Sequence, residues 1–418
     1  MPPEETLDPE DWQSIRGRPT LRFGEFVALM AMMISLVALS IDAMLPALSE
    51  IGQDLGVQRD NDNQLIISLL LLGMAIGQMV YGPLSDSTGR KLAIYAGFGL
   101  FIIGCLLSLF ATSFSVMLAG RVLQGMGVAG PRNVTVALVR DQYEGRAMAR
   151  VMSFVMAVFI LVPVIAPAFG QALLIVAHWR AIFGAFLALA LIVLIWFAIR
   201  QPETLAPNRR ARFSLKRIVM AIREICANRL AFGYTIAMGL VFGAFLGYLN
   251  SAQQVFQAQY GLGRQFPLYF AALALAIGSA SYLNTRLVMR YGMRPLTNWS
   301  LQTLGGLSIV FFTIAYALAG NPPLWTLMIY FAISFFCIGI LFGNLNALAM
   351  EPLGHIAGVG AAVVGSLSTS ISVLLGIVIG QSYNGAILPL VGGFAILGAA
   401  SMVAMRWAEY RKPVSGIC

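Results

Sequence analysis

Twelve long apolar stretches divide this chain of 418 residues and decide what it can fold into. Each is close to the roughly 20 residues that a helix needs to cross a bilayer core about 30 Å thick. Strands of a membrane barrel would instead alternate apolar and polar residues over about ten positions. The sequence therefore predicts an all-α integral membrane protein. Its expected spans are residues 23–46, 64–82, 92–111, 116–138, 150–172, 181–199, 230–252, 266–285, 296–319, 324–346, 357–380 and 386–406.

Composition and charge placement agree with this class of protein. Hydrophobic residues make up 59% of the chain and charged residues 11%, too few to cover a soluble protein. A net charge of +9 could otherwise indicate nucleic-acid binding. With the amino terminus inside, only Arg59, Arg180 and Arg264 fall in outer loops and two arginines fall within spans, so 22 of the 27 bases are on the inner side. We expect both termini to be cytoplasmic, and no nucleic-acid partner.

Cysteine and histidine give no sign of a metal or disulfide site. The four cysteines are scattered, and the two histidines fall in separate loops. Free thiols packed as small apolar groups are the expected arrangement. We expect neither a metal nor another cofactor. These residues are Cys105, Cys226, Cys337, Cys418, His178 and His355.

A polar segment over residues 200–229 divides the spans into six and six. Within it, Leu215, Ile218, Val219, Ile222 and Ile225 recur at helical spacing among bases. This pattern predicts a basic amphipathic helix on the inner membrane surface, in preference to a calmodulin-like partner site. The expected organisation is a tail (1–22), a first six-helix half (23–199), the linker (200–229), a second six-helix half (230–406) and a tail (407–418).

The connections after the second and eighth spans form a weak internal repeat. The first contains Gly82-Pro83-Leu84-Ser85-Asp86-Ser87-Thr88-Gly89-Arg90-Lys91, which we interpret as a polar turn with one acid and two bases. The second, residues 284–294, keeps glycine and the bases but lacks the acid. Two six-span halves with matching inner loops are typical of transporters whose halves rock around a midplane site.

The first of these connections resembles the signature of the major facilitator superfamily, and the resemblance extends over essentially the whole chain. It implies two pseudo-symmetric six-helix halves. It also implies a conformational latch of Gly82, Asp86, Gly89 and Arg90, in which Asp86 docks at the amino-terminal end of the eleventh helix. A carboxylate at a helix amino terminus gains about 0.3 to 1 kcal/mol, which makes such a latch physically reasonable.

Two further motifs carry the resemblance. Arg121-Val122-Leu123-Gln124-Gly125 is similar to the fourth-helix motif common in proton-coupled members. A cation inside hydrocarbon costs at least ~2.5 kcal/mol, so Arg121 is expected to face a polar interior, with an outward-snorkelling arginine as the alternative. Asp42-Ala43-Met44-Leu45-Pro46-Ala47 resembles an element of Bcr/CflA-type drug exporters, although Met44 replaces the usual tyrosine. Asp42 and Arg121 lie at similar expected depth and could pair, which makes them candidates for proton coupling.

The fifth span departs from the family's antiporter element. Pro163, Pro167 and Gly170 match it, while Ala166 and Gln171 replace two glycines. Proline and glycine also kink membrane helices without any transport role. The two replacements weaken the support that this element gives to export, so export is the expected direction on the other motifs and import stays open as the alternative.

Candidate cavity residues follow from helix geometry. Arg121 and Arg132 are three turns apart, about 16 Å, and project from nearly one face. Two such arginines would outweigh Asp42 and favour neutral, zwitterionic or anionic amphiphiles; alternatively, Arg132 binds a carbonyl or a nearby acid. Further candidate wall residues, for which packing is the commoner role, are Gln124, Tyr248, Asn250, Gln254, Tyr330 and Ser334.

The expected function is proton-coupled efflux of small amphipathic compounds, such as drugs, across the bacterial inner membrane by alternating access. The alternative is an importer or facilitator of a specific small solute. A membrane enzyme or a sensor would need a catalytic constellation or a soluble signalling domain, and the sequence indicates neither. The expected partners are the small-molecule substrate, protons and membrane lipid, and we expect a monomer.

Overall fold

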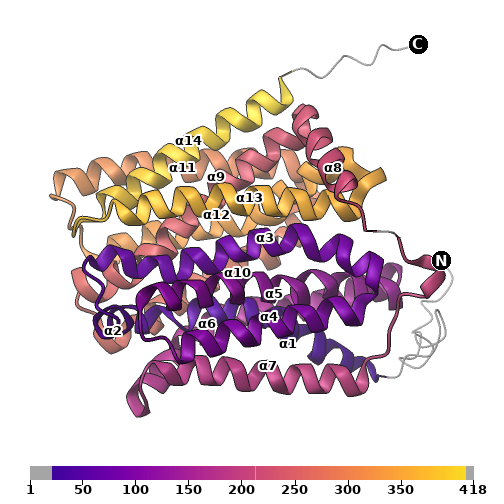
Figure 1. Ribbon diagram of the computed structural model, residues 1–418. Coiled ribbons are helices and arrows are strands. Elements are labelled where there is room, and N and C mark those ends of the chain that lie inside the picture. The colour runs from indigo at the N-terminus through magenta and orange to yellow at the C-terminus, as the bar shows by residue number, and fades with distance from the viewer. Residues whose placement is uncertain (1–20, 212, 411–418) are drawn as a thin grey trace, which may run out of the picture.

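Twelve long helices form one bundle in the computed structural model, which describes residues 21–211 and 213–410 (Figure 1). They are α1 (Phe23–Asp42), α3 (Leu65–Thr88), α4 (Arg90–Leu109), α5 (Phe114–Gln142), α6 (Gly145–Val176), α7 (Arg180–Arg200), α9 (Arg229–Gln253), α10 (Phe266–Tyr291), α11 (Met293–Ala317), α12 (Leu324–Met350), α13 (Ala357–Gln381) and α14 (Leu388–Glu409). The described residues contain no strand.

Short helical elements join the long ones. They are η2 (Leu45–Ala47), α2 (Leu48–Asp54), η3 (Asp60–Gln64), η4 (Pro207–Arg209), α8 (Leu215–Ala227), the π-helix η5 (Gln254–Gln259), η6 (Gly263–Gln265) and η7 (Glu351–Ile356). The start of α1, the end of α14 and α8 lie at one end of the bundle, which we call the linker end (Figure 1). The opposite end carries α2 and η3, and we call it the α2 end.

The predicted membrane-spanning architecture is confirmed. Ten helical segments among the described residues are long and apolar enough to cross a membrane, and the longest, Leu324–Gln381, contains both α12 and α13. The segment α5 is not among the ten, since Arg121, Arg132 and neighbouring polar residues lower its hydropathy. It nevertheless packs along α3 and α4 inside the bundle.

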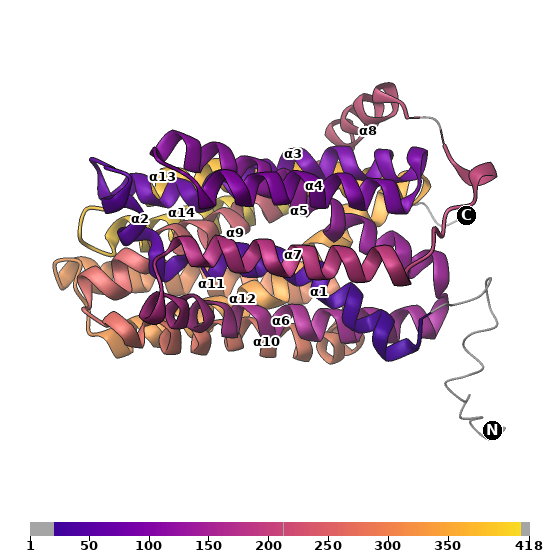
Figure 2. The ribbon, with the colours of Figure 1, turned by 60° about the horizontal axis from the view of Figure 1, so that its bottom comes forward.

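The two six-helix halves meet along two pairs of helices. The first half comprises α1 and α3 to α7, and the second comprises α9 to α14. Contacts between them run along α3 and α13 on one side and along α6 and α10 on the other. Figures 1 and 2 both show α3 beside α13. Any site between the halves therefore lies between these two contact lines.

Glycines of the fourth-helix motif let α5 approach its neighbours. A Cβ at Gly125 would lie 1.8 Å from the carbonyl oxygen of Leu70 on α3. A Cβ at Gly127 would lie 2.3 Å from the backbone nitrogen of Phe101 on α4. Small residues commonly permit such close backbone approach in membrane bundles. These motif glycines thus serve packing within the first half.

The interpretation of residues 82–91 as a turn is wrong. The helix α3 continues to Thr88, so Gly82 and Asp86 belong to its last two turns, and only Gly89 separates α3 from α4. Gly89 has φ 103°, a conformation that side chains other than glycine rarely adopt. Backbone hydrogen bonds inside a helix do not require an apolar environment, so the helix extends past the apolar residues that predicted it.

Candidate functional site

Side-chain amides join the two halves at the α2 end. Gln64 Nε2, at the end of η3, donates to Gln254 Oε1 and, at 3.2 Å, to the carbonyl oxygen of Gly380. Gln254 Nε2 donates to Asn61 Oδ1 at 2.8 Å. Asn61 Nδ2 donates to the carbonyl oxygen of Gln381 at 3.1 Å, and Gln381 Nε2 donates to that of Asn61 at 2.9 Å. We call Asn61, Gln64, Gln254 and Gln381 the amide network.

Neighbouring polar side chains add further hydrogen bonds between the two halves at the α2 end. Ser68 Oγ on α3 donates to Asn250 Oδ1 on α9 at 3.1 Å. Gln253 Nε2 donates to Ser49 Oγ at 2.7 Å. Tyr383, whose carbonyl oxygen accepts from Asn61 at 2.9 Å, follows α13, and burial raises the pKa of its phenol. Within residues 21–211 and 213–410, no ion pair joins the two halves. The α2 end is therefore held closed by neutral groups.

One glycine makes room for the amide network. A Cβ at Gly380 would lie 1.9 Å from Gln64 Oε1, so any other residue here would displace the Gln64 amide. Gly380 therefore lets the Gln64 amide reach the α13 backbone. Asn250 and Gln254 were predicted as cavity residues, and the structure places both among the polar contacts that join the halves at the α2 end. Asn61, Gln64 and Gln381 were not predicted as site residues, although polar side chains at the ends of spans could have indicated them.

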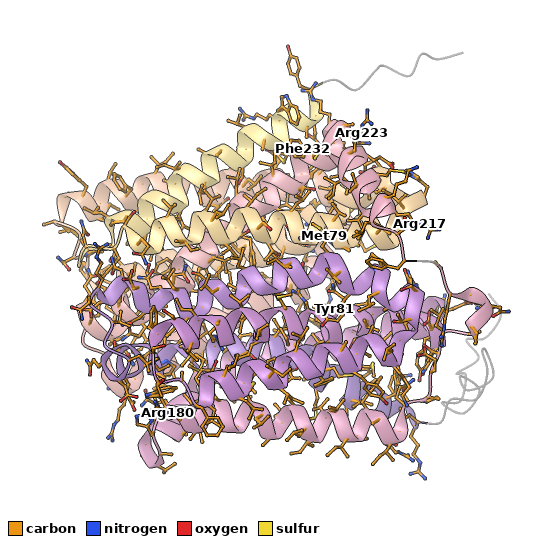
Figure 3. The ribbon with its side chains drawn as sticks, in the orientation of Figure 1. Met79, Tyr81, Arg180, Arg217, Arg223 and Phe232 are labelled. Atoms are coloured by element: carbon orange, nitrogen blue, oxygen red, sulfur yellow. The ribbon has the colours of Figure 1, made fainter. Side chains whose placement is uncertain are left out.

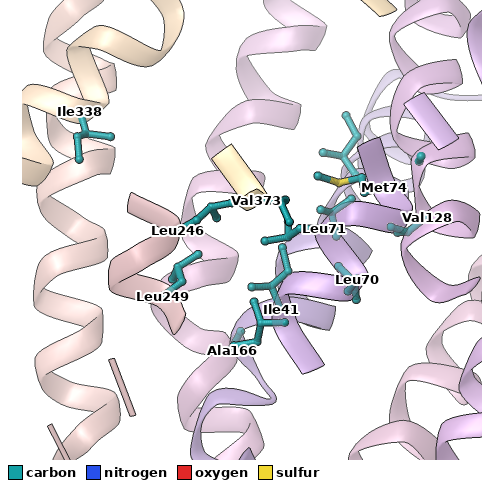
Figure 4. Close-up of a cluster of buried hydrophobic side chains, with 14 of the residues drawn as sticks. Ile41, Leu70, Leu71, Met74, Val128, Ala166, Leu246, Leu249, Ile338 and Val373 are labelled. Carbon is teal, nitrogen blue, oxygen red and sulfur yellow. The ribbon is translucent and has the colours of Figure 1, made fainter. Parts of the chain in front are cut away.

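An apolar layer lies on the linker side of the amide network. Figure 4 shows Ile41 of α1, Leu71 of α3, Ala166 of α6, Leu246 of α9 and Val373 of α13 gathered there. All five side chains are buried. The direction of α3, α9 and α13 puts these residues one to two turns closer to the middle of the bundle than the amides. Apolar and amide contacts together close the α2 end of the interface between the halves.

Asp42 ends α1 beside this apolar layer. It is 5% exposed, and its carboxyl forms no hydrogen bond or ion pair with the residues that the structure describes. The segment η2, which closely follows Asp42 in the chain, contacts α9 of the second half. A buried carboxylate without a cation is costly. This acid is therefore an unusual feature, placed at the contact between the halves.

The helix α6 packs directly on the break after Asp42. A Cβ at Gly170 would lie 2.0 Å from the carbonyl oxygen of Ala43, so only glycine fits at this position. Pro163 and Pro167 lie inside α6, which continues as one helix through both. Pro167 and Gly170 are on its buried face, whereas Pro163 is half-buried. The motif residues of the fifth span thus position α6 against the end of α1.

Arg121 binds backbone carbonyls instead of Asp42. Its side chain is fully buried; Nε donates to the carbonyl oxygen of Ile66 at 2.8 Å, and one terminal nitrogen donates to that of Ser40 at 2.7 Å. Because Ser40 is in the last turn of α1, this bond satisfies a carbonyl that the helix leaves without a partner. The predicted Asp42–Arg121 ion pair does not form in this structure.

Gln124 links Arg121 to α4 through hydrogen bonds. It accepts from Arg121 at 2.7 Å, and its Nε2 donates to Ser108 Oγ at 2.9 Å and to the carbonyl oxygen of Gly104 at 3.0 Å. Gln124 is fully buried between α4 and α5, within the first half. Arg121 and Gln124 together therefore bind α1, α3 and α4 to α5.

Arg132 has a different environment, two-thirds of the way along α5. It is half-buried, and among the described residues its one side-chain hydrogen bond is to the thioether sulfur of Met74 on α3, at 3.4 Å. Sulfur is a weak acceptor for a guanidinium with five donors. Asn133 Nδ2 donates to the carbonyl oxygen of Gln78 one turn along α3, at 3.3 Å. No acid in the described part of the chain pairs with Arg132.

A charged cluster lies at the linker end of the first half. Arg90 donates to Asp86, to Ser85 Oγ at 2.7 Å and to Asp141 Oδ2 at 2.8 Å. The Asp86 side chain is 42% exposed. The first turn of α13 has no side-chain cap, so Asp86 does not dock there in this structure. The latch assigned to Gly82, Asp86, Gly89 and Arg90 remains a prediction.

The linker is bound to the same cluster. Glu203 accepts from the backbone nitrogens of Arg90 and Lys91, at 2.9 and 3.0 Å, and so caps α4. A Cβ at Gly89 would lie 2.5 Å from Glu203 Oε2, which gives Gly89 a second reason to be glycine. The backbone nitrogen of Ala211 donates to the carbonyl oxygen of Asp86 at 2.9 Å.

The second half has its own version of this cluster. Arg294, after the positive-φ Gly292, donates to Glu351 at 2.7 Å and to Glu409 at 3.1 Å. Tyr234 donates its hydroxyl hydrogen to Glu409 at 2.6 Å. The turn lacks an acid, as the sequence indicates, but neighbouring helix ends supply two.

The aromatic candidates lie in the interior of the second half. The Tyr248 ring contacts Phe335 and Phe331, with centroids 4.6 and 5.2 Å away. Tyr330 stacks on Phe311 at 4.3 Å and shares a hydrogen bond with Ser308 at 2.9 Å. Both tyrosines and Ser334 are buried. In this structure they pack α9, α11 and α12 together.

Comparisons with known proteins agree with this architecture. The family model described as Major Facilitator Superfamily matches residues 29–377. A bicyclomycin resistance protein homolog of Haemophilus influenzae is 28% identical over 362 residues, covering 84% of this chain and 87% of that protein. Multidrug resistance protein D of Escherichia coli is 27% identical over 414 residues, covering 93% and 98%. The E. coli xylose transporter XylE, in a partially occluded inward open conformation, has the same fold, with a TM-score of 0.72 over 95% of this chain and 99% of that chain, at 11% identity.

Proposed function

The chain belongs to the Major Facilitator Superfamily, and from that premise we propose that it exports small amphipathic compounds, drugs among them, in exchange for protons. It is a membrane transporter and not an enzyme. Drug export is supported by two relatives whose names refer to bicyclomycin resistance and multidrug resistance.

The observation that carries the proton coupling is the position of Asp42. A carboxyl that is buried without a cation gains from binding a proton. Asp42 is buried just before η2, which contacts α9 of the second half, so alternating opening of the two ends would expose it to one side and then to the other. Because the amide network is neutral, its strength does not depend on pH in the ordinary range. Protonation of Asp42 is then the step that would make the contact between the halves at the α2 end depend on pH.

Alternating access would open the α2 end and the linker end in turn. In the present state the α2 end is closed by the amide network and the apolar layer, and Asp86 pairs with Arg90. Opening the α2 end would separate these amides. Closing the linker end would bring Asp86 toward the amino terminus of α13, where a carboxylate is stabilised by the free N-H groups.

We place the linker end in the cytoplasm. The bases of the inner loops, Arg90, Arg140, Arg146, Arg200 and Arg294 among them, lie at or near this end. Lys and Arg accumulate in cytoplasmic loops of membrane proteins. The protein would then be a multi-pass protein of the inner membrane, active as a monomer, with a substrate path from the linker end to the α2 end.

The proposed substrates are neutral, zwitterionic or anionic amphiphiles. Arg132 has donors that Met74 does not satisfy, and it has no acidic partner among the described residues. An anionic or carbonyl group of the substrate would supply the missing acceptor. Such a site would disfavour compact dications by charge repulsion.

Transport in proteoliposomes tests the proposal. Purified protein is reconstituted with an inward or outward pH gradient, and accumulation of a neutral phenicol-type compound is measured with and without an uncoupler. Export coupled to protons predicts uphill movement that the uncoupler abolishes. Downhill movement that ignores the pH gradient would instead support the facilitator, and accumulation in the opposite direction would support an importer.

A further inference from the structure

The linker helix α8 packs only one of its faces against the bundle. Ser214 Oγ accepts from the backbone nitrogen of Arg217 at 3.4 Å and starts the helix. Ile218, Ala221 and Ile225 are buried against α13 and α9 of the second half. His355 of η7 holds the same helix through Glu224, with 2.6 Å between Nε2 and Oε1.

A second apolar stripe on α8 is exposed. Leu215 is 67% exposed and Val219 63%, and the exposed Cys226 is two turns beyond Val219. Positions four and seven apart lie on one side of a helix. We call Leu215, Val219 and Cys226 the exposed stripe. It adjoins the packed face and would be unfavourable in water.

Bases border the exposed stripe. Lys216 and Arg223, seven residues apart, share the side of α8 next to the stripe, whereas Arg217 lies on the opposite side of the helix from the stripe. All three are exposed, and none forms a side-chain hydrogen bond or ion pair within the described ranges. Figure 3 shows Arg217 and Arg223 at the linker end, directed away from the helices on which α8 packs. The nearby acid Glu224 is occupied by His355.

The place of α8 is at the margin of the bundle. Figure 1 shows it at the linker end, and Figure 2 shows it at the edge beyond α3. An amphipathic helix at such a margin is level with the surface of the membrane that the long helices cross. Exposed apolar residues flanked by bases are the composition of helices that lie in a bilayer interface.

We propose that α8 is a docking surface for anionic phospholipid headgroups. The exposed stripe enters the boundary between headgroups and acyl chains, and Lys216 and Arg223, which border the stripe, bind the headgroup phosphates. Juxtamembrane bases attract anionic lipid in this way. This inference rests on the proposed function only for the side of the membrane involved, the cytoplasmic leaflet.

Such docking would act on the contact between the halves. The linker is bound to the first half through Glu203 and Ala211, whereas α8 is bound to the second half. Lipid bound to α8 would hold this helix, and with it the linker end of the second half, at the membrane surface while the first half moves. The lipid composition of the leaflet would then influence transport rate.

The test uses the full chain in nanodiscs, whose two leaflets are alike, so membrane orientation does not affect it. A nitroxide is attached to Cys226 after Cys105, Cys337 and Cys418 are replaced by alanine. Collision rates with oxygen and with a water-soluble nickel chelate are measured in phosphatidylcholine, with and without phosphatidylglycerol. We expect phosphatidylglycerol to raise the ratio of oxygen to nickel collisions by at least about threefold.

Two variants make the test specific. Combined Lys216→Gln and Arg223→Gln should abolish the phosphatidylglycerol effect. The control, Arg286→Gln with Arg290→Gln, neutralises exposed bases at the linker end of α10 and should retain it. Equal collision ratios in both lipids, or a lipid effect that survives the combined Lys216→Gln and Arg223→Gln variant, would overturn the proposal. Since transport is not measured, failure here is distinct from failure of the proposed export.

Discussion

Arg121 binds the carbonyl oxygen of Ser40 at 2.7 Å, two residues before Asp42, and forms no ion pair with Asp42 itself. The arginine thereby satisfies a carbonyl at the end of α1, while the acid has no charged partner among the residues that the structure describes. Structural support and proton binding can thus belong to different residues. This separation yields distinct predictions for the two side chains.

For Asp42→Asn we expect loss of proton-coupled transport with folding retained. Asparagine has nearly the same shape, and no ion pair is lost in this state. Substrate-driven proton flux in proteoliposomes should fall to background, while thermal unfolding changes little. Glu50→Gln, on an exposed acid of α2, is the control and should transport normally. Undiminished uphill transport by Asp42→Asn would remove Asp42 from the mechanism.

For Arg121→Met we expect a stability defect. The substitution leaves two buried carbonyl oxygens and Gln124 without their donor. Each bond from a charged donor contributes about 1.5–3 kcal/mol, so the melting temperature in detergent should drop clearly. Arg121→Lys should recover only part of the lost melting temperature, because one ammonium cannot reach three acceptors on different helices. A variant that is as stable as the parent but unable to couple protons would assign Arg121 to coupling instead.

For Gly170→Ala we expect a loss of both stability and transport. The new Cβ would lie 2.0 Å from the carbonyl oxygen of Ala43, and overpacking of this kind costs about 1–3 kcal/mol. Gly184→Ala is the matched control, since nothing lies within 4 Å of a Cβ there and α7 is helical at this position. The melting temperatures of Gly170→Ala and Gly184→Ala are compared, and we expect only that of Gly170→Ala to fall. Equal stability would mean that α6 does not pack on the break of α1 as described.

For Asn61→Ala we expect the α2 end to open more often. Three side-chain hydrogen bonds between the halves are lost, each contributing about 1 kcal/mol. Spin-label distances between the halves at the α2 end should shift toward longer values. Asn321→Ala removes a loop amide that bonds only within the second half, so it should leave the distances unchanged. An unaltered distribution in Asn61→Ala would show that these amides do not control closure.

The fold was predictable because most spans are long apolar runs, and α5, which polar residues interrupt, was still long enough to be recognised as a span. Helix ends were not, since α3 continues to Thr88 through polar residues whose backbone bonds are internal to the helix. Asn61 and Gln381 meet although 320 residues separate them, and a single sequence holds no sign of that pairing. Tyr248 and Tyr330 were predicted as candidate cavity walls, with packing as the commoner role, and in this structure their large rings are buried in the interior of the second half. The glycines show the same limit: Gly125 and Gly170 were visible in motifs, but their partners, Leu70 and Ala43, were not.

The last prediction concerns the charge of the substrate. Arg132 is the half-buried cation of α5, with a weak acceptor in Met74 and no acid among the described residues to balance it. If substrate supplies the missing acceptor, Arg132→Gln should raise the KM for anionic and zwitterionic compounds at least about tenfold, in line with the roughly 1.5–3 kcal/mol of a charge-assisted bond. The KM for neutral compounds should change less. Dications should compete for transport by the variant better than they compete for transport by the parent protein. Arg140→Gln, on an exposed base two turns further along α5, is the control. Competition with a panel graded by charge measures this, and a parent protein that already prefers dications would contradict the proposed substrate class.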